Sequence, residues 1–147
     1  MTLHLIKLCV GCDSIEELAS WQADRLKQRR KAGEKNPQLF HRTFQSPKRR
    51  DELLSGGSLY WVIKGLVQVR QPLLDITEGT KEDGSACCVL ILKNELVAVR
   101  PVPRRPFQGW RYLQPDDVPH DLGGRAGEGI SAMPPQMRKQ LADLGLI

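Results

Sequence analysis

The chain has 147 residues, of which 40% are hydrophobic and 27% charged, and its formal net charge is +5 at pH 7. No apolar run is long enough to cross a bilayer, and the N-terminus lacks the cationic segment and cleavage site of a secretory signal. From these features we expect neither a membrane-spanning nor a secreted protein. We therefore expect one cytoplasmic domain over residues 1–147, with its four cysteines reduced and a core that needs neither disulfides nor metal.

The positive charge is concentrated in two segments. Residues 25–50 contain ten lysines and arginines against a single acid, Glu34, and residues 98–112 contain four arginines and no acid. The remainder of the chain is net negative. Such segregation favours a polyanionic partner, although cationic side chains also commonly do no more than solvate a helix end or a loop.

The first third of the chain reads as a strand followed by a helix. Residues 3–10 alternate weakly, and Asp13 or Ser14 can cap a helix that runs to about Lys31, with Glu16 or Glu17 completing a capping box. The helix would face the core with Ile15, Leu18, Ala19 and Leu26. Gly33 and Pro37 end it, and a second, short helix is expected after Ser46-Pro47.

The stretch Ser58–Arg70 alternates apolar and polar residues with the period of a half-buried strand. Its odd positions are apolar and would face the core, whereas its even positions carry Ser58, Tyr60, Lys64, Gln68 and Arg70. The alternation does not slip at Gly65, which predicts one long strand that bends there without a bulge. Its polar face would then be free to bind a ligand.

Further strands complete a sheet. Residues 87–92 are continuously apolar, as expected for a strand in the middle of a sheet, whereas the three prolines of Arg100–Pro106 restrict that segment to an edge or a surface. A last strand is expected over residues 107–113 and a terminal helix over Pro135–Leu144. The predicted fold class is α+β, with a curved, mostly antiparallel sheet forming a small open barrel flanked by N-terminal and C-terminal helices.

The strongest functional signal lies in residues 100–112, where arginines alternate with Phe107, Trp110 and Tyr112. Arginines can bind phosphates and aromatic rings can stack on bases, a combination that holds RNA and other single-stranded nucleic acid. Core packing explains Phe107 and Trp110 equally well. We predict a nucleic-acid-binding module, with RNA the expected partner and no cofactor. The expected contact residues are Arg42, Lys48, Arg49, Arg50, Tyr60, Lys64, Gln68, Arg70, Arg104, Arg105, Trp110 and Arg111.

Two other functions remain open. In an enzyme acting on a phosphorylated small molecule or nucleotide, His41 would be the acid or base, Arg42 and Lys64 would hold an anion, and Asp75 would be a partner. His41 has no nucleophile at a fixed spacing, so a structural role in packing or hydrogen bonding is favoured over a role as general base. In a protein-interaction adaptor, Arg104–Tyr112 would form an arginine and aromatic hot spot.

The chain offers no convincing metal site. Cys9 and Cys12 have the spacing of a redox pair or half a zinc site, but adjacent Cys87 and Cys88 would point to opposite faces of a strand. Buried thiols are therefore expected. The group Asp116, Asp117, His120 and Asp121 reads as solvated turn residues between two prolines.

Several motifs resemble those of one known family. They are His41-Arg42-Thr43, the run from Leu53 to Gly65, Phe107–Leu113, and the C-terminal segment from Met133 to Leu146. Together they are similar to an uncharacterised, mainly alphaproteobacterial family catalogued as a domain of unknown function, which implies one bacterial domain but no activity. The order of elements is also loosely similar to the pseudouridine-synthase-and-archaeosine-transglycosylase (PUA) barrels and their activating-signal-cointegrator (ASCH) relatives. That similarity implies RNA or modified-base binding by fold analogy alone.

Overall fold

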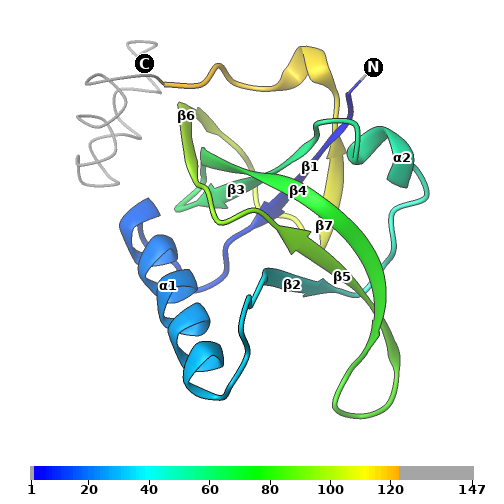
Figure 1. Ribbon diagram of the computed structural model, residues 1–147. Coiled ribbons are helices and arrows are strands. Elements are labelled where there is room, and N and C mark those ends of the chain that lie inside the picture. Colours follow the sequence, from blue (N-terminus) through cyan, green and yellow to red (C-terminus); the bar gives the residue numbers. More distant parts are fainter. Residues whose placement is uncertain (1, 123–147) are drawn as a thin grey trace.

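The computed structural model describes residues 2–122, which fold around a strongly curved sheet (Figure 1). The elements follow in the order β1 (His4–Leu8), α1 (Ile15–Lys31), β2 (Leu39–Thr43), α2 (Arg50–Leu53), β3 (Ser58–Ile63), β4 (Leu66–Thr80), β5 (Ala86–Leu92), β6 (Val97–Pro103), β7 (Trp110–Leu113) and η1 (Pro115–Asp117), a short 3-10 helix. The helix predicted over Pro135–Leu144 lies outside the described residues.

The strands form one sheet in the order β2-β5-β4-β3-β1-β7, with β6 paired to β4 beside this path. Only the β1–β3 pair is parallel among the pairs of named strands in residues 2–122. The α+β class and the mostly antiparallel sheet are therefore as predicted. The expected barrel is not formed, because the path ends at β2 and β7 and the sheet does not close on itself.

The curvature is carried by β4, the longest strand (Figure 1). Its first half pairs with β3 and β6, and its second half pairs with β5. The change of partner falls at Pro72–Asp75, where the register shifts and a proline has no NH to donate. One strand thus belongs to two parts of the curved sheet. Strand β5 is an internal strand of that sheet, because β2 pairs with it on one side and β4 on the other.

The prediction of one bent strand over Ser58–Arg70 is wrong, because this stretch is a hairpin. Lys64 and Gly65 have φ values of 53° and 77°, and the Ile63↔Leu66 pair closes a two-residue turn. Two positive φ angles reverse the chain with the twist that antiparallel strands prefer. A bulge also occurs: Trp61 pairs with Val69 but Val62 with Val67, which leaves Gln68 as the extra residue.

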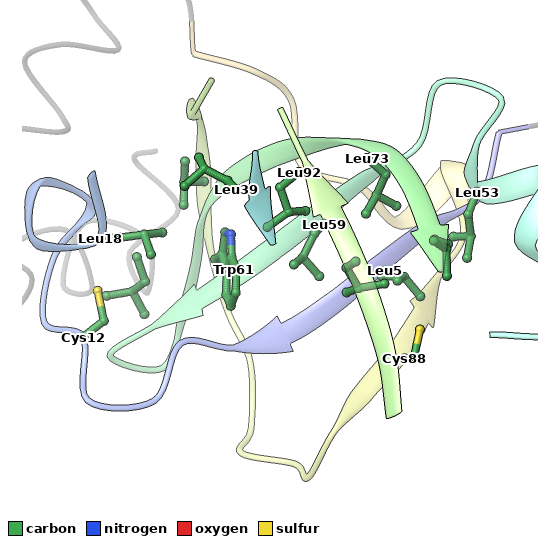
Figure 2. Packing of buried hydrophobic residues seen from close by; sticks show 14 of the residues in the cluster. Leu5, Cys12, Leu18, Leu39, Leu53, Leu59, Trp61, Leu73, Cys88 and Leu92 are labelled. Atoms are coloured by element: carbon green, nitrogen blue, oxygen red, sulfur yellow. The ribbon is translucent and has the colours of Figure 1, made fainter. Parts of the chain in front are cut away.

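Because of the bulge, odd and even positions do not keep to the same face of the sheet along the whole hairpin. Val69 packs with Leu59, Trp61 and Ile63 in the main core, whereas Val67 packs in a second cluster with Tyr60. All six residues of β3 are buried, so this strand has core on both faces. In Figure 2, Trp61 stands between Leu18 and Cys12 on one side and Leu59 and Leu92 on the other.

Helix α1 docks on the main core through a polar pair as well as leucines. Ser14 caps it as expected, its hydroxyl accepting a hydrogen bond from the amide of Glu17 at 3.1 Å. Its buried residues are Leu18, Gln22 and Leu26, whereas the predicted Ala19 is exposed. The Gln22 and Gln71 amides exchange two hydrogen bonds of 2.9 and 3.0 Å, so a buried polar contact fixes the helix to β4.

The arginine and proline segment lies at an edge, as predicted. Within it, β6 pairs with β4 on one side only, and residues 120–122 add isolated contacts to its other side, such as the amide of Arg100 donating to the His120 carbonyl at 2.8 Å. In the described part of the chain, no helix has both the length and the apolar character to cross a membrane.

Candidate nucleic-acid interface

The two basic segments of the sequence meet where the loop after β2 packs against β7. The hydroxyl of Tyr112 accepts hydrogen bonds from the amides of Lys48 and Arg49, at 2.9 and 3.2 Å. The indole of Trp110 donates to the Gln45 carbonyl at 2.8 Å, and the Trp110 and Tyr112 rings meet edge to face at 4.9 Å. The two aromatic residues of β7 thus hold the basic loop in place.

A groove opens beside this contact, with a volume of about 400 Å³. It is lined by Phe44, Gln45, Gln108, Gly109, Trp110 and Arg111. Phe44 is 80% exposed, which is unusual for a ring of this size, while Trp110 is half-buried. Aromatic faces, amides and a guanidinium therefore share one concave surface.

Cations surround the groove. The ammonium of Lys81 lies 4.2 Å from the centre of the Phe44 ring, and the guanidinium of Arg111 lies 5.5 Å from that of Phe107. Lys48 is exposed. Among residues 2–122, none of the ion pairs involves Lys48, Lys81 or Arg111. Within this part of the chain, these three cations are therefore not held in ion pairs, although hydrogen bonds from Ser85 and the nearby charge of Lys81 lower the pKa of Asp83.

Other predicted contact residues lie near this region and differ in whether an acidic side chain pairs with them. Arg104 stacks over Phe107 at 5.9 Å, and Arg105 is exposed. Arg49 pairs with Glu52, and Arg50 pairs with Asp75 and donates to the Ile76 carbonyl. Arg49 and Arg50 are thus engaged by acids of the protein, whereas within residues 2–122 Arg104 and Arg105 are in no ion pair.

The polar residues of the hairpin are not brought to the groove. Tyr60 and Gln68 are buried, with 3% and 1% exposure, and the Gln68 amide donates to the Ile63 carbonyl at 2.7 Å. Lys64 pairs with Asp13 at 3.0 Å. Arg70 makes a two-pronged bond to Asp121 at 2.8 and 2.7 Å. These four side chains are held by partners inside the protein.

A second concave region, the α1–β2 cleft, consists of two adjoining hollows of about 140 and 450 Å³. Both are lined by Arg25, Leu39, Phe40 and His41. Arg42 lies at the outer hollow and Lys7 at the inner one. Of the predicted contact residues, only Arg42 therefore lines the cleft.

His41 sits inside this cleft with its ring edge-on to Trp61, 5.3 Å between centres. Burial, with Lys7 and Arg25 nearby, lowers the pKa of His41 to about 4. The imidazole is therefore neutral at pH 7, with one donor and one acceptor nitrogen. Neither Lys64 nor Asp75 lines the cleft, since each is paired elsewhere, so the arrangement expected for an enzyme is not assembled.

The cysteines are not set up as nucleophiles or metal ligands. Burial, followed by contacts with Cys12, raises the pKa of Cys9 well above its ordinary value, so its thiol stays protonated. Cys12 donates to the Ser14 carbonyl at 3.0 Å. Within residues 2–122, no three His, Cys, Asp or Glu side chains converge as they would around a metal ion.

Sequence reasoning missed Phe44, Lys81 and the cleft residues Lys7 and Arg25. The sequence did contain one signal for Phe44. Phe40, Arg42 and Phe44 occupy every second position along β2 and the residue after it, so they are expected on one face of the strand. In the structure the Arg42 guanidinium lies 5.5 Å from the centre of the Phe40 ring. The contribution of Lys81 depends on the folding of the β4–β5 loop, which no local pattern indicates.

Comparison with known proteins identifies a family but no activity. A family model described as a protein of unknown function, DUF1489, matches residues 5–147. The match covers nearly the whole chain, so the protein belongs to this family. No curated protein and no solved structure matches it.

Proposed function

We propose that this member of the DUF1489 family is a module that binds single-stranded RNA through the groove beside β7. The observation that carries the proposal is the 80% exposed ring of Phe44, which opens onto a groove shared with Trp110 and Arg111. Full burial of a phenylalanine side chain stabilises a protein by about 1.5–3 kcal/mol, and most of this stabilisation is missing in the free protein because the Phe44 ring is exposed. A base stacked on the Phe44 ring would cover its surface and so contribute part of this free energy to binding.

The groove supplies each contact that a single strand needs. Phe44 and Trp110 offer stacking surfaces, Arg111 and Lys48 offer donors to phosphates, and the exposed side chain of Gln108 can meet a base edge. Because the amides of residues 48 and 49 are tied to Tyr112, the basic loop is ordered before binding.

The lining of the groove favours binding over catalysis. Among the described residues, its lining includes no His, Cys, Asp, Glu or Lys side chain that could serve as a general acid or base. We extend the proposal to a bacterial, cytoplasmic protein, where RNA is accessible. The sheet is open, so the loose similarity to the PUA and ASCH barrels lends no support, and the proposal rests on the groove.

The salt dependence of RNA affinity tests the proposal. Fluorescence anisotropy with a labelled single-stranded RNA, measured at several salt concentrations, should show log K falling with log salt at about −0.7 per phosphate contact. Two to four contacts from the groove cations give a slope of roughly −1.4 to −2.8. Absence of binding at low salt, or an affinity indifferent to salt, rejects the proposal.

A second arm separates RNA binding from general attraction to polyanions and from a protein adaptor. Inorganic polyphosphate has no bases to stack, so at equal charge it should bind more weakly than RNA. Equal binding of polyphosphate and RNA would contradict the stacking role of Phe44. A protein partner that is retained after nuclease treatment, with no RNA bound, would favour the adaptor.

A further inference from the structure

The α1–β2 cleft is separate from the groove and has its own chemistry. None of the residues that line it also lines the groove. Its inner hollow is lined by the end of β1, by α1 and by β2, together with Trp61 of β3 and Leu92 of β5. A ligand could occupy it without displacing anything that the groove needs.

The inner part of the cleft is aromatic and apolar. Trp21, Phe40 and Trp61 all line the inner hollow, together with leucines of α1, β2 and β5. Trp21 keeps 38% of its surface exposed, and the Phe40 ring is only half-buried. Partly uncovered rings on α1 and β2 that line the same hollow suit a flat, aromatic ligand that packs against them.

Three of the four cations that line the cleft have no ion-pair partner within residues 2–122. Lys7, Arg25 and Arg42 line the two hollows, and none of them takes part in an ion pair among the described residues. Arg29 differs, because Glu34 holds it at 2.7 Å while it covers the Phe40 ring. It therefore serves as a wall, and the three unpaired cations are left to hold an anion.

His41 adds a selective contact between the aromatic and cationic parts. Its ring lines both hollows and is braced against Trp61. A neutral imidazole can donate one hydrogen bond and accept another, as the edge of a base requires. It adds no charge of its own to the cleft.

We propose that the α1–β2 cleft binds one nucleotide, with its base in the aromatic inner hollow, near His41, and its phosphate held by Arg25 and Arg42. The ligand can be a free nucleoside monophosphate or an unstacked nucleotide of a single strand, because the two present the same base and phosphate. This second site extends the protein beyond the groove and does not rest on it.

Calorimetric titration of the full chain tests the site, with each of the four ribonucleoside 5′-monophosphates and with inorganic phosphate as probes. At least one nucleotide should bind more tightly than inorganic phosphate. Arg25→Gln should weaken that binding by about tenfold, the loss of one charge-assisted hydrogen bond. Arg30→Gln is the matched control on the same helix, exposed and outside the cleft, and should leave the affinity unchanged.

The outcomes separate this site from the groove. The nucleotide affinity should survive Phe44→Ala, which removes the groove ring but no cleft residue. If a short RNA also loses affinity in Arg25→Gln, the occupant is a nucleotide of the strand; if only the monophosphate does, it is the free nucleotide. No binding of any monophosphate at millimolar concentration, binding no tighter than that of phosphate, or equal effects of Arg25→Gln and Arg30→Gln would overturn the proposal.

Discussion

The β3–β4 hairpin and the groove carry the same kinds of side chain with opposite fates. Both offer an aromatic ring, an arginine and an amide. In the hairpin, Tyr60 is buried against the ring of His4 at 5.3 Å, and Arg70 is bound by Asp121 and Ser58. In the groove, Phe44 is 80% exposed, and Arg111 has no acid partner within residues 2–122.

The difference shows that residue type alone does not mark a binding surface. A side chain whose hydrogen bonds and apolar surface are satisfied inside the protein has little to gain from a ligand. A ring left in water, as that of Phe44 is, does have something to gain. We therefore expect substitutions in the hairpin to change stability, and those in the groove to change affinity.

The largest expected effect is that of Tyr60→Ala. Tyr60 is 3% exposed and lies in the second core cluster, so its removal leaves a cavity and should lower the free energy of unfolding by about 3–4 kcal/mol. Phe44→Ala is the matched aromatic control and should change the free energy of unfolding by less than about 0.5 kcal/mol. Urea unfolding at pH 7 measures both. Equal losses would break the contrast between the two regions.

A second prediction extends the contrast to His41, which is partly buried in the cleft. Its pKa is about 4 in the folded protein and about 6.5 unfolded, so the unfolded state binds more protons between these values. Stability is therefore fully present above pH 6.5 and is lost as the pH falls toward 4. Between pH 7 and 5 the loss should be about 2 kcal/mol.

His41→Gln supplies the reference for this measurement, because it removes the titrating group while keeping a polar side chain. Urea unfolding of both proteins at pH 7, 6 and 5 gives the difference in slope, and contributions from His4 and the carboxylates cancel. The variant should lose about 2 kcal/mol less stability than the parent over this interval. Parallel pH profiles would mean that His41 is not held neutral.

Arg70→Gln should have a smaller effect on stability and none on RNA affinity. It breaks the two-pronged bond to Asp121 and the bond to Ser58, at a partly exposed site, for a loss of about 1 kcal/mol. Thermal unfolding and RNA anisotropy on the same samples check both. If RNA affinity falls while stability holds, the hairpin is a binding surface after all.

The groove variant Phe44→Ala should have a free-energy effect as small as that of Arg70→Gln, but on RNA binding and not on stability. Loss of one stacked base should weaken RNA binding by about 1 kcal/mol, roughly fivefold. The matched control is Leu74→Ala, which removes an exposed apolar side chain, 50% accessible, from β4 outside the groove. Anisotropy at low salt measures both. If the two variants bind RNA equally, Phe44 is not a stacking platform.

Sequence reasoning succeeded where the cause is local. The cap at Ser14 depends on residues within one turn, and the edge position of β6 follows from prolines that cannot donate. It failed at the hairpin because a lysine at φ 53° is not a recognisable turn former, and because the bulge at Gln68 changes parity without a sequence signal.

The site was only partly predictable for a related reason. Trp110 and Arg111 were identified from their own segment, but the side chains that complete or satisfy a surface come from distant parts of the chain. Arg70 meets Asp121, 51 residues away, and Trp110 meets Gln45, 65 residues away. Which cations are neutralised is decided by such contacts, which composition and periodicity do not encode.

Mapping of backbone amide shifts in the 15N-labelled full chain tests the central claim most directly. On addition of unlabelled single-stranded RNA, the account predicts the largest changes at residues 44–49 and 108–112, with small changes in the hairpin at residues 58–70. Changes centred on the hairpin, or none in the groove at saturating RNA, would contradict it.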